Sequence, residues 1–100
     1  MIQKGEYIRD LLRGDAGQSV HAHGWVKTRR DSKGITFVQL NDGSAFQDLQ
    51  VVIEQGAIAE ETLRDVTTGV CIKVSGTLVE SPASGQRVEL NAEGIERSEE

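Results

Sequence analysis

Two runs of alternating apolar and polar residues, joined by the turn sequence DSKG, constrain the fold of this 100-residue chain more than any other feature. Residues 19–31, SVHAHGWVKTRRD, and residues 35–42, ITFVQLND, keep the period of two that a half-buried strand requires. They predict an antiparallel hairpin whose first strand turns Val20, Ala22, Gly24 and Val26 inward, with a bend or bulge at Gly24. The opposite face of that strand is expected to carry His21, His23, Trp25, Lys27 and Arg29.

The second strand of this hairpin places an aromatic side chain on the outer surface. Phe37 alternates with Val38 and Leu40, so Phe37 must face outward if those two face the core. The net charge of the chain is −5, yet residues 27–33 carry a local charge of +3. A basic segment on an otherwise acidic chain indicates a surface for a polyanion, and the alternative is a solvated hairpin tip.

The remaining patterns complete a small β-rich domain. Tyr7, Ile8, Leu11 and Leu12 have the spacing of an amphipathic helix, expected over residues 4–14 and stopped at Gly14. A third strand is expected at 46–54, a helix within 56–69, a fourth strand at 70–80 and a fifth at 87–95. The inward residues of these strands would be Leu49, Val51, Ile53, Val70, Ile72, Val74, Leu78, Val88, Leu90 and Ala92.

This order of elements predicts an all-β domain with a minor helical part. Five strands with a helix after the third fit the OB-fold, a partly open Greek-key barrel, with the barrel at 18–96 and residues 1–100 as a single domain. Gly24 and Gly76 would lie where strongly curved strands bend. A five-stranded sandwich of another topology is the alternative.

Three outward residues on strands two, three and five have a chemistry suited to an unpaired nucleobase. Phe37 offers a stacking platform, worth about 1–3 kcal/mol per base. Gln50 carries a donor and an acceptor for a base edge, and Lys27, Arg29, Arg30 and Lys33 would hold phosphates. Each has a simpler interpretation: Phe37 could lie under the N-terminal helix, Gln50 could be plain surface polarity, and Glu89 is one acid among sixteen.

Two long stretches carry a resemblance to a known family. GWVKTRRDSKGITFVQLNDGSAFQDLQVVI and TTGVCIKVSGTLVESPASGQRVELNAEGIE resemble the N-terminal anticodon-binding OB-fold domain of class IIb aminoacyl-tRNA synthetases, and among these the asparaginyl members. The resemblance runs from about Val20 to Ile95. It implies that the chain binds tRNA through the anticodon, G-U-U for asparagine.

The resemblance also implies roles for individual residues. The middle uridine would stack on Phe37 and present its edge to Gln50, Arg30 would contact the anticodon, and Glu89 would accept hydrogen bonds from a guanine at the first position. The third base would meet the loop at 81–87. Weaker candidates there are Ser84, Gln86 and Arg87.

No catalytic or metal-binding motif is apparent in the sequence. It lacks a phosphate-cradling glycine loop, and His21, His23 and Cys71 have no zinc-type spacing, so we expect no cofactor, no metal and no catalysis by this chain alone. The resemblance implies a parent ligase that is a homodimer and uses ATP and magnesium in a catalytic domain, whereas the isolated domain would be monomeric. One cysteine and no apolar span favour the cytoplasm, away from membranes. A free-standing single-strand binder and a protein-interaction module are the alternative functions.

Overall fold

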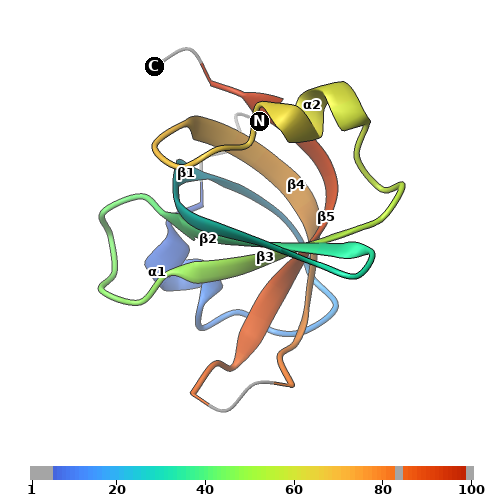
Figure 1. Ribbon diagram of the computed structural model, residues 1–100. Coiled ribbons are helices and arrows are strands. Elements are labelled where there is room, and N and C mark those ends of the chain that lie inside the picture. Colours follow the sequence, from blue (N-terminus) through green and yellow to red (C-terminus); the bar gives the residue numbers. More distant parts are fainter. Residues whose placement is uncertain (1–5, 83–84, 99–100) are drawn as a thin grey trace, which may run out of the picture.

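Five strands close into a barrel in the order β1-β2-β3-β5-β4, with one helix between the third and fourth strands (Figure 1). The computed structural model describes residues 6–82 and 85–98. The β3–β5 pair is parallel and the other four pairs are antiparallel. This is the predicted OB-fold. The elements are α1 (Ile8–Leu11), β1 (Ser19–Ser32), β2 (Ile35–Asn41), β3 (Leu49–Glu54), α2 (Glu60–Arg64), β4 (Cys71–Glu80) and β5 (Val88–Arg97).

The barrel interior is filled by the alternating residues that the sequence marks as inward. Val38 and Leu40 on β2 are fully buried, as are Leu49 and Val51 on β3. The predicted inward residues of β1, β4 and β5 are buried as well, except that Val70 precedes β4 and is only half-buried. Phe37 lies on the outside, so the predicted facing of β2 is confirmed.

A β-bulge interrupts β1 at Lys27, three residues after Gly24, where a bend or bulge was expected. Val26 pairs with Leu40 and Thr28 pairs with Gln39, so Lys27 is an extra residue in the β1–β2 ladder. At Gly24, where the sequence suggested the bulge, the ladder is regular. A Cβ there would collide with the carbonyl oxygen of Asn41, so glycine is required by close backbone approach.

The bend expected at Gly76 is confirmed. The register of the β4–β5 pair shifts between Ser75 and Gly76, and a Cβ on Gly76 would collide with the carbonyl oxygen of Asn91. Such a close approach lets β4 curve tightly around the closed barrel.

The N-terminal helix is a single turn that is tied to the barrel by side chains from the β2–β3 loop. Ile8 and Leu11 are buried, whereas Tyr7 is exposed. The Ile8 N–H donates to Asp42 Oδ2 at 3.0 Å, and the Arg9 N–H donates to Ser44 Oγ at 3.0 Å. Because residue 7 supplies no capping side chain, these distant acceptors satisfy the free N–H groups at the start of α1.

The ionisation of Asp42 is coupled to this tie. Burial opposes the charged form, but hydrogen bonds from Ser44 and from the Ile8 N–H outweigh it and hold the pKa of Asp42 below its usual range.

The helices of the described residues are both short, and neither could cross a membrane.

We predict that Asp42→Ala lowers the free energy of unfolding by about 1 kcal/mol at pH 7, the usual cost of a lost helix cap. Because the folded-state pKa is lowered, the contribution is complete above the unfolded value of about 3.9 and disappears as the pH falls through the folded value. Urea unfolding at pH 7 and in stepwise more acidic buffers should show the two proteins converging. Asp10→Ala, at an exposed carboxylate 3.8 Å from Arg9, is the control and should change little.

Candidate nucleic-acid interface

The outward side chains of neighbouring strands form one continuous surface, which we call the Phe37 face. Phe37 on β2 lies opposite Arg30 on β1 and Val52 on β3, and Gln39 lies opposite Gln50. Val51 pairs with Leu90 across the parallel β3–β5 seam, so the outward residues just before them, Gln50 and Glu89, are neighbours. The Phe37 face comprises Arg30, Phe37, Gln39, Gln50 and Glu89.

Arg30 covers the aromatic ring of this face. Its guanidinium carbon lies 4.5 Å from the centroid of the Phe37 ring, within the range of a cation–π interaction. Phe37 is therefore half-buried, although it points away from the core. The bulge at Lys27 creates this contact, because it turns Arg30 to the outer side of β1.

The polar members of the Phe37 face are arranged around Gln50. Gln39 Nε2 donates to Gln50 Oε1 at 3.0 Å. Glu89 is 6% exposed even though it points outward, and its Oε1 atom is buried without a hydrogen-bond partner. Leaving a buried carboxylate oxygen without a hydrogen-bond donor costs free energy. Glu89 is therefore a candidate acceptor for a donor group of a ligand.

Arg29 has a different position from the one expected, because the bulge reverses the alternation of β1. It pairs with the inward residue Val38 and its side chain is 22% exposed. Its Nη1 donates to the carbonyl oxygens of Leu63 at 2.7 Å and Val66 at 2.9 Å, at the C-terminal end of α2. The predicted outward orientation of Arg29 is wrong: its guanidinium holds the helix that closes this end of the barrel.

Asp31 completes the clamp around Arg29. The Thr36 hydroxyl donates to Asp31 Oδ1 at 2.8 Å, and Arg29 Nε donates to the same oxygen at 3.2 Å. The hydrogen bond from Thr36 and the neighbouring Arg29 guanidinium lower the pKa of Asp31 against a smaller opposing effect of desolvation. The carboxylate therefore offsets the charge of Arg29 and keeps it in place.

The other predicted site residues lie around the edges of the Phe37 face. Lys27 at the bulge and Lys33 in the β1–β2 turn are exposed. In the β4–β5 loop, Gln86 is half-buried and Arg87 forms an ion pair with Asp15 at 3.1 Å. Ser84 lies outside the described residues.

Two residues of this surface were missed by the sequence reasoning. Gln39 was not singled out in the sequence, and only its position opposite Gln50 reveals its role. Phe46 was placed in a strand, but it lies in the β2–β3 loop with its side chain fully exposed. Gln47 Nε2 in the same loop donates to the Gly85 carbonyl at 3.2 Å, which joins this loop to the one between β4 and β5. The glycine and serine of NDGS were the signal for a loop here.

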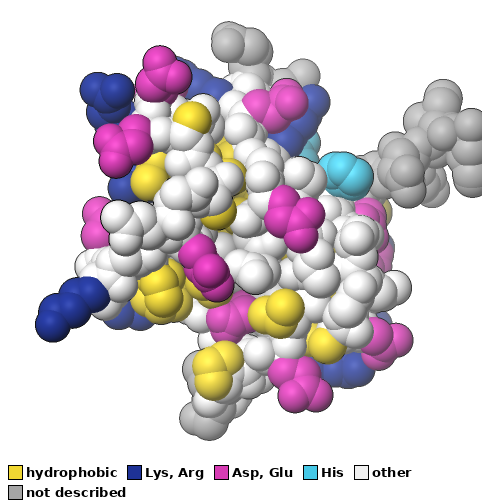
Figure 2. Space-filling model, turned by 90° about the vertical axis from the view of Figure 1, so that its right-hand side faces the viewer, with side chains coloured by type: hydrophobic (Ala, Val, Ile, Leu, Met, Phe, Trp, Pro, Cys, Tyr) yellow, Lys and Arg dark blue, Asp and Glu magenta, His cyan; other side chains and the backbone are white. Residues whose placement is uncertain are grey.

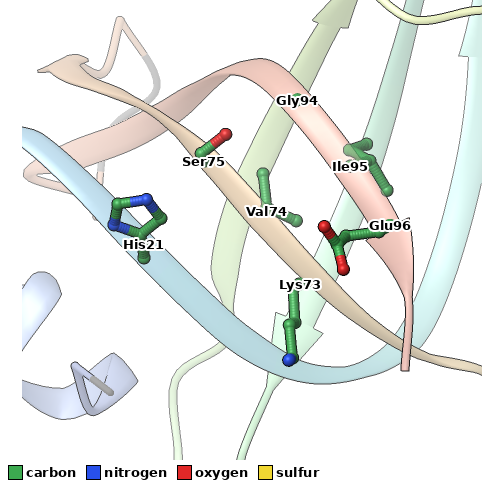
Figure 3. Close-up of a pocket in the computed structure, with 7 residues that line it drawn as sticks. All are labelled: His21, Lys73, Val74, Ser75, Gly94, Ile95 and Glu96. Carbon is green, nitrogen blue, oxygen red and sulfur yellow. The ribbon is translucent and has the colours of Figure 1, made fainter. Parts of the chain in front are cut away.

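A separate hollow of about 330 Å³ lies on the part of the barrel built by β1, β4 and β5 (Figure 3). His21, Lys73, Ser75 and Glu96 are among the residues that line it, and none of its lining residues is Phe, Tyr or Trp. Acidic side chains are spread over the face seen in Figure 2, with Lys and Arg mostly at its margins.

Across residues 6–82 and 85–98, no group of three or more His, Cys, Asp or Glu side chains is placed to hold a metal ion.

Comparison with known proteins identifies the family of this barrel. The model of the tRNA anti-codon family, an OB-fold nucleic acid binding domain, matches residues 20–97. The chain belongs to this family. The resemblance noted from the sequence is thereby confirmed, and the Phe37 face lies on the strands of an OB-fold nucleic acid binding domain.

Individual relatives share one name. The chain is 53% identical over 95 residues to an asparagine–tRNA ligase of Solibacter usitatus and 50% identical over 95 residues to one of Phocaeicola vulgatus; each alignment covers 95% of this chain. The chain spans about a fifth of these relatives, 21% and 20% of their length. The crystal structure of asparaginyl-tRNA synthetase from Pyrococcus horikoshii superimposes with a TM-score of 0.81 at 20% identity, over 94% of this OB-fold chain and 23% of that one.

We predict that two adjacent arginines contribute unequally to the free energy of unfolding. Arg29→Met should lower the free energy of unfolding by about 2 kcal/mol, because two carbonyls at the end of α2 lose a charged donor. Arg30→Met should cost less than about 1 kcal/mol, since it loses only an exposed cation–π contact. Urea unfolding of both variants checks this, and equal losses would show that Arg29 is not a clamp.

Proposed function

We propose that this OB-fold domain recognises the anticodon of the asparagine tRNA as part of an asparagine–tRNA ligase. The observation that carries the proposal is the Phe37 face, where an aromatic ring, an amide and a buried unpartnered carboxylate oxygen lie on adjacent strands. Stacking and polar readout of unpaired bases is how sequence-specific RNA recognition works on single-stranded loops. The two relatives that are 53% and 50% identical to this chain over 95 residues are both named asparagine–tRNA ligases.

The middle base of the anticodon, uridine, would stack on Phe37. The Arg30 guanidinium covers the ring, so an incoming base must displace it. A displaced guanidinium next to the backbone of the bound nucleotide can pair with a phosphate, which compensates the lost cation–π contact. Gln50, on the neighbouring strand, would then meet the edge of the stacked base.

The first base, guanine, would meet Glu89. Guanine presents two adjacent donors, N1–H and the N2 amino group, on its Watson–Crick edge, and a carboxylate is the acceptor that can take both. The buried Glu89 Oε1 has no partner in the free protein, so guanine would satisfy it and any base without these donors would leave it unpaired. Glu89 would therefore favour guanine over the other bases, because a base without these donors would leave its buried oxygen without a hydrogen bond.

Phosphates and the third base would be held at the edges of the Phe37 face. Lys27 and Lys33 are exposed beside it and would add affinity that depends on salt. Gln86 and Arg87 in the β4–β5 loop are the described candidates for the third base, and Arg87 would have to leave Asp15 to take part. Arg29 is not assigned to the RNA, because its Nη1 and Nε atoms hold α2 and Asp31.

The ligation itself belongs to the remainder of such a ligase. We infer that a catalytic domain outside the aligned fifth of the relatives joins asparagine to its tRNA with ATP and magnesium, in a cytoplasmic homodimer. The part described here supplies recognition: it selects the tRNA that the catalytic domain acylates.

We predict that the 100-residue chain binds an RNA stem-loop with the anticodon G-U-U at least tenfold more tightly than the same loop with G-C-U. Phe37→Ala should weaken G-U-U binding about tenfold or more, the effect of one lost stacked base. Gln50→Ala should reduce the preference for uridine. Fluorescence titration of both loops measures the dissociation constants, and circular dichroism verifies that each variant is folded.

The alternatives give different results in the same titration. Equal binding of both loops would indicate an unspecific single-strand binder, in which the exposed Phe46 supplies a second aromatic platform. No binding of either loop at low salt would indicate a protein-interaction module.

We predict that Arg30→Ala weakens binding to every RNA and makes the logarithm of the binding constant less steep against the logarithm of salt concentration. One lost phosphate contact reduces the slope by about 0.7 for a single strand. Titrations between 50 and 200 mM KCl, with Arg13→Ala as a matched exposed control, measure the change. The same slope in wild type and Arg30→Ala would remove Arg30 from the phosphate contacts.

A further inference from the structure

The amide of Gln50 is held by a second amide across the strand pair. Gln39 and Gln50 lie directly opposite each other on β2 and β3, both half-buried on the outer side. Gln39 Nε2 donates to Gln50 Oε1 at 3.0 Å. This hydrogen bond couples the orientations of the two amides, so that neither can turn over alone without losing it.

That orientation matters because a free glutamine cannot distinguish the two pyrimidines. Uracil offers an acceptor at O4 beside a donor at N3–H, whereas cytosine offers a donor at N4 beside an acceptor at N3. A carboxamide has one donor side and one acceptor side, so it matches uracil in one orientation and cytosine after a turn of 180° about its terminal bond. Unless Gln50 is prevented from turning, both bases would pair with it.

Two neighbours of Gln50 favour the same orientation. The donor from Gln39 requires Oε1 on the β2 side, which leaves Nε2 on the side of β5 and Glu89. The unpartnered carboxylate oxygen of Glu89 attracts an N–H group and repels a carbonyl. If both amides turned over together their hydrogen bond would survive, but the Gln50 carbonyl would then face Glu89, so Glu89 sets the direction of the pair.

We propose that Gln39 is a positioning residue that locks the Gln50 amide and thereby makes it select uracil over cytosine at the middle anticodon position. This inference depends on the proposed function, since it assigns a mechanism to the base selectivity of the Phe37 face. Gln39 acts only through Gln50 and is given no contact with RNA.

Two substitutions of Gln39 separate orientation from mere packing. Gln39→Leu removes the donor while keeping the size of the side chain, so the amide of Gln50 becomes free to turn. Gln39→Glu replaces the donor with a carboxylate that only accepts, so it draws Gln50 Nε2 toward β2 and turns the amide over. A residue that merely supports the sheet would affect both pyrimidine loops equally.

The measured quantity is the ratio of the dissociation constants of the G-C-U and G-U-U stem-loops for the folded 100-residue chain. Relative to wild type, we expect Gln39→Leu to lower this ratio about fivefold, the effect of one net hydrogen bond. Gln39→Glu should lower it further, to one or below. Gln55→Glu adds the same charge at an exposed position outside the Phe37 face, and it should weaken both loops without changing the ratio.

The outcomes distinguish this inference from the proposed function. A wild-type ratio well above one that stays unchanged in both Gln39 variants overturns the role of Gln39 and leaves anticodon recognition intact. A wild-type ratio of one overturns both. If a variant does not fold, ¹⁵N NMR of the RNA-free wild type decides: side-chain amide protons of Gln39 protected from exchange and close to Gln50 support the lock, and freely exchanging ones overturn it.

Discussion

The extra residue in β1 determines how the two adjacent arginines are used. Before the bulge at Lys27, the inward residues of β1 are the even-numbered ones that end at Val26; after it, the inward residue is Arg29. One arginine is thereby directed to the end of the barrel, where it holds α2, and the next is directed outward onto Phe37. Without the bulge, Arg30 would face the interior and the aromatic ring would have no cover. Both the closed end of the barrel and its recognition surface therefore depend on a single backbone irregularity.

The sequence was sufficient for the features that follow from hydrophobic periodicity. Val38 and Leu40 alternate without interruption, so the inward set of β2 and the outward position of Phe37 were predictable. A bend or a bulge was predicted at Gly24, because glycine in a strand often marks one or the other. A bulge requires no particular side chain, and nothing about Lys27 in the sequence indicates one. The alternating pattern therefore could not predict which way the residues of β1 after Lys27 face. The resemblance to a family supplied Arg30 despite this reversal.

The candidate site was predicted less completely because it depends on contacts between distant strands. Gln39 becomes informative only through the register that sets it opposite Gln50. The family resemblance named Glu89, but its burial and its unpartnered oxygen are evident only in the structure. Neither register nor burial of an outward residue can be obtained from local sequence. The tie from Asp42 to α1 spans 34 positions, so it was hidden for the same reason. Local patterns specified the barrel, whereas the chemistry of its outer face arises from the closure of the barrel.

The guanidinium over Phe37 also affects the protein when no RNA is bound. An uncovered phenyl ring on the outside of the barrel is an apolar surface with which unrelated apolar surfaces can associate. With Arg30 lying on it, the Phe37 ring presents a charged exterior, so this ring resists such associations. Displacing the Arg30 guanidinium from the ring is favourable only for a flat ligand that also offers it a nearby anion. The ring is thereby restricted to ligands that carry both groups, as a nucleotide does.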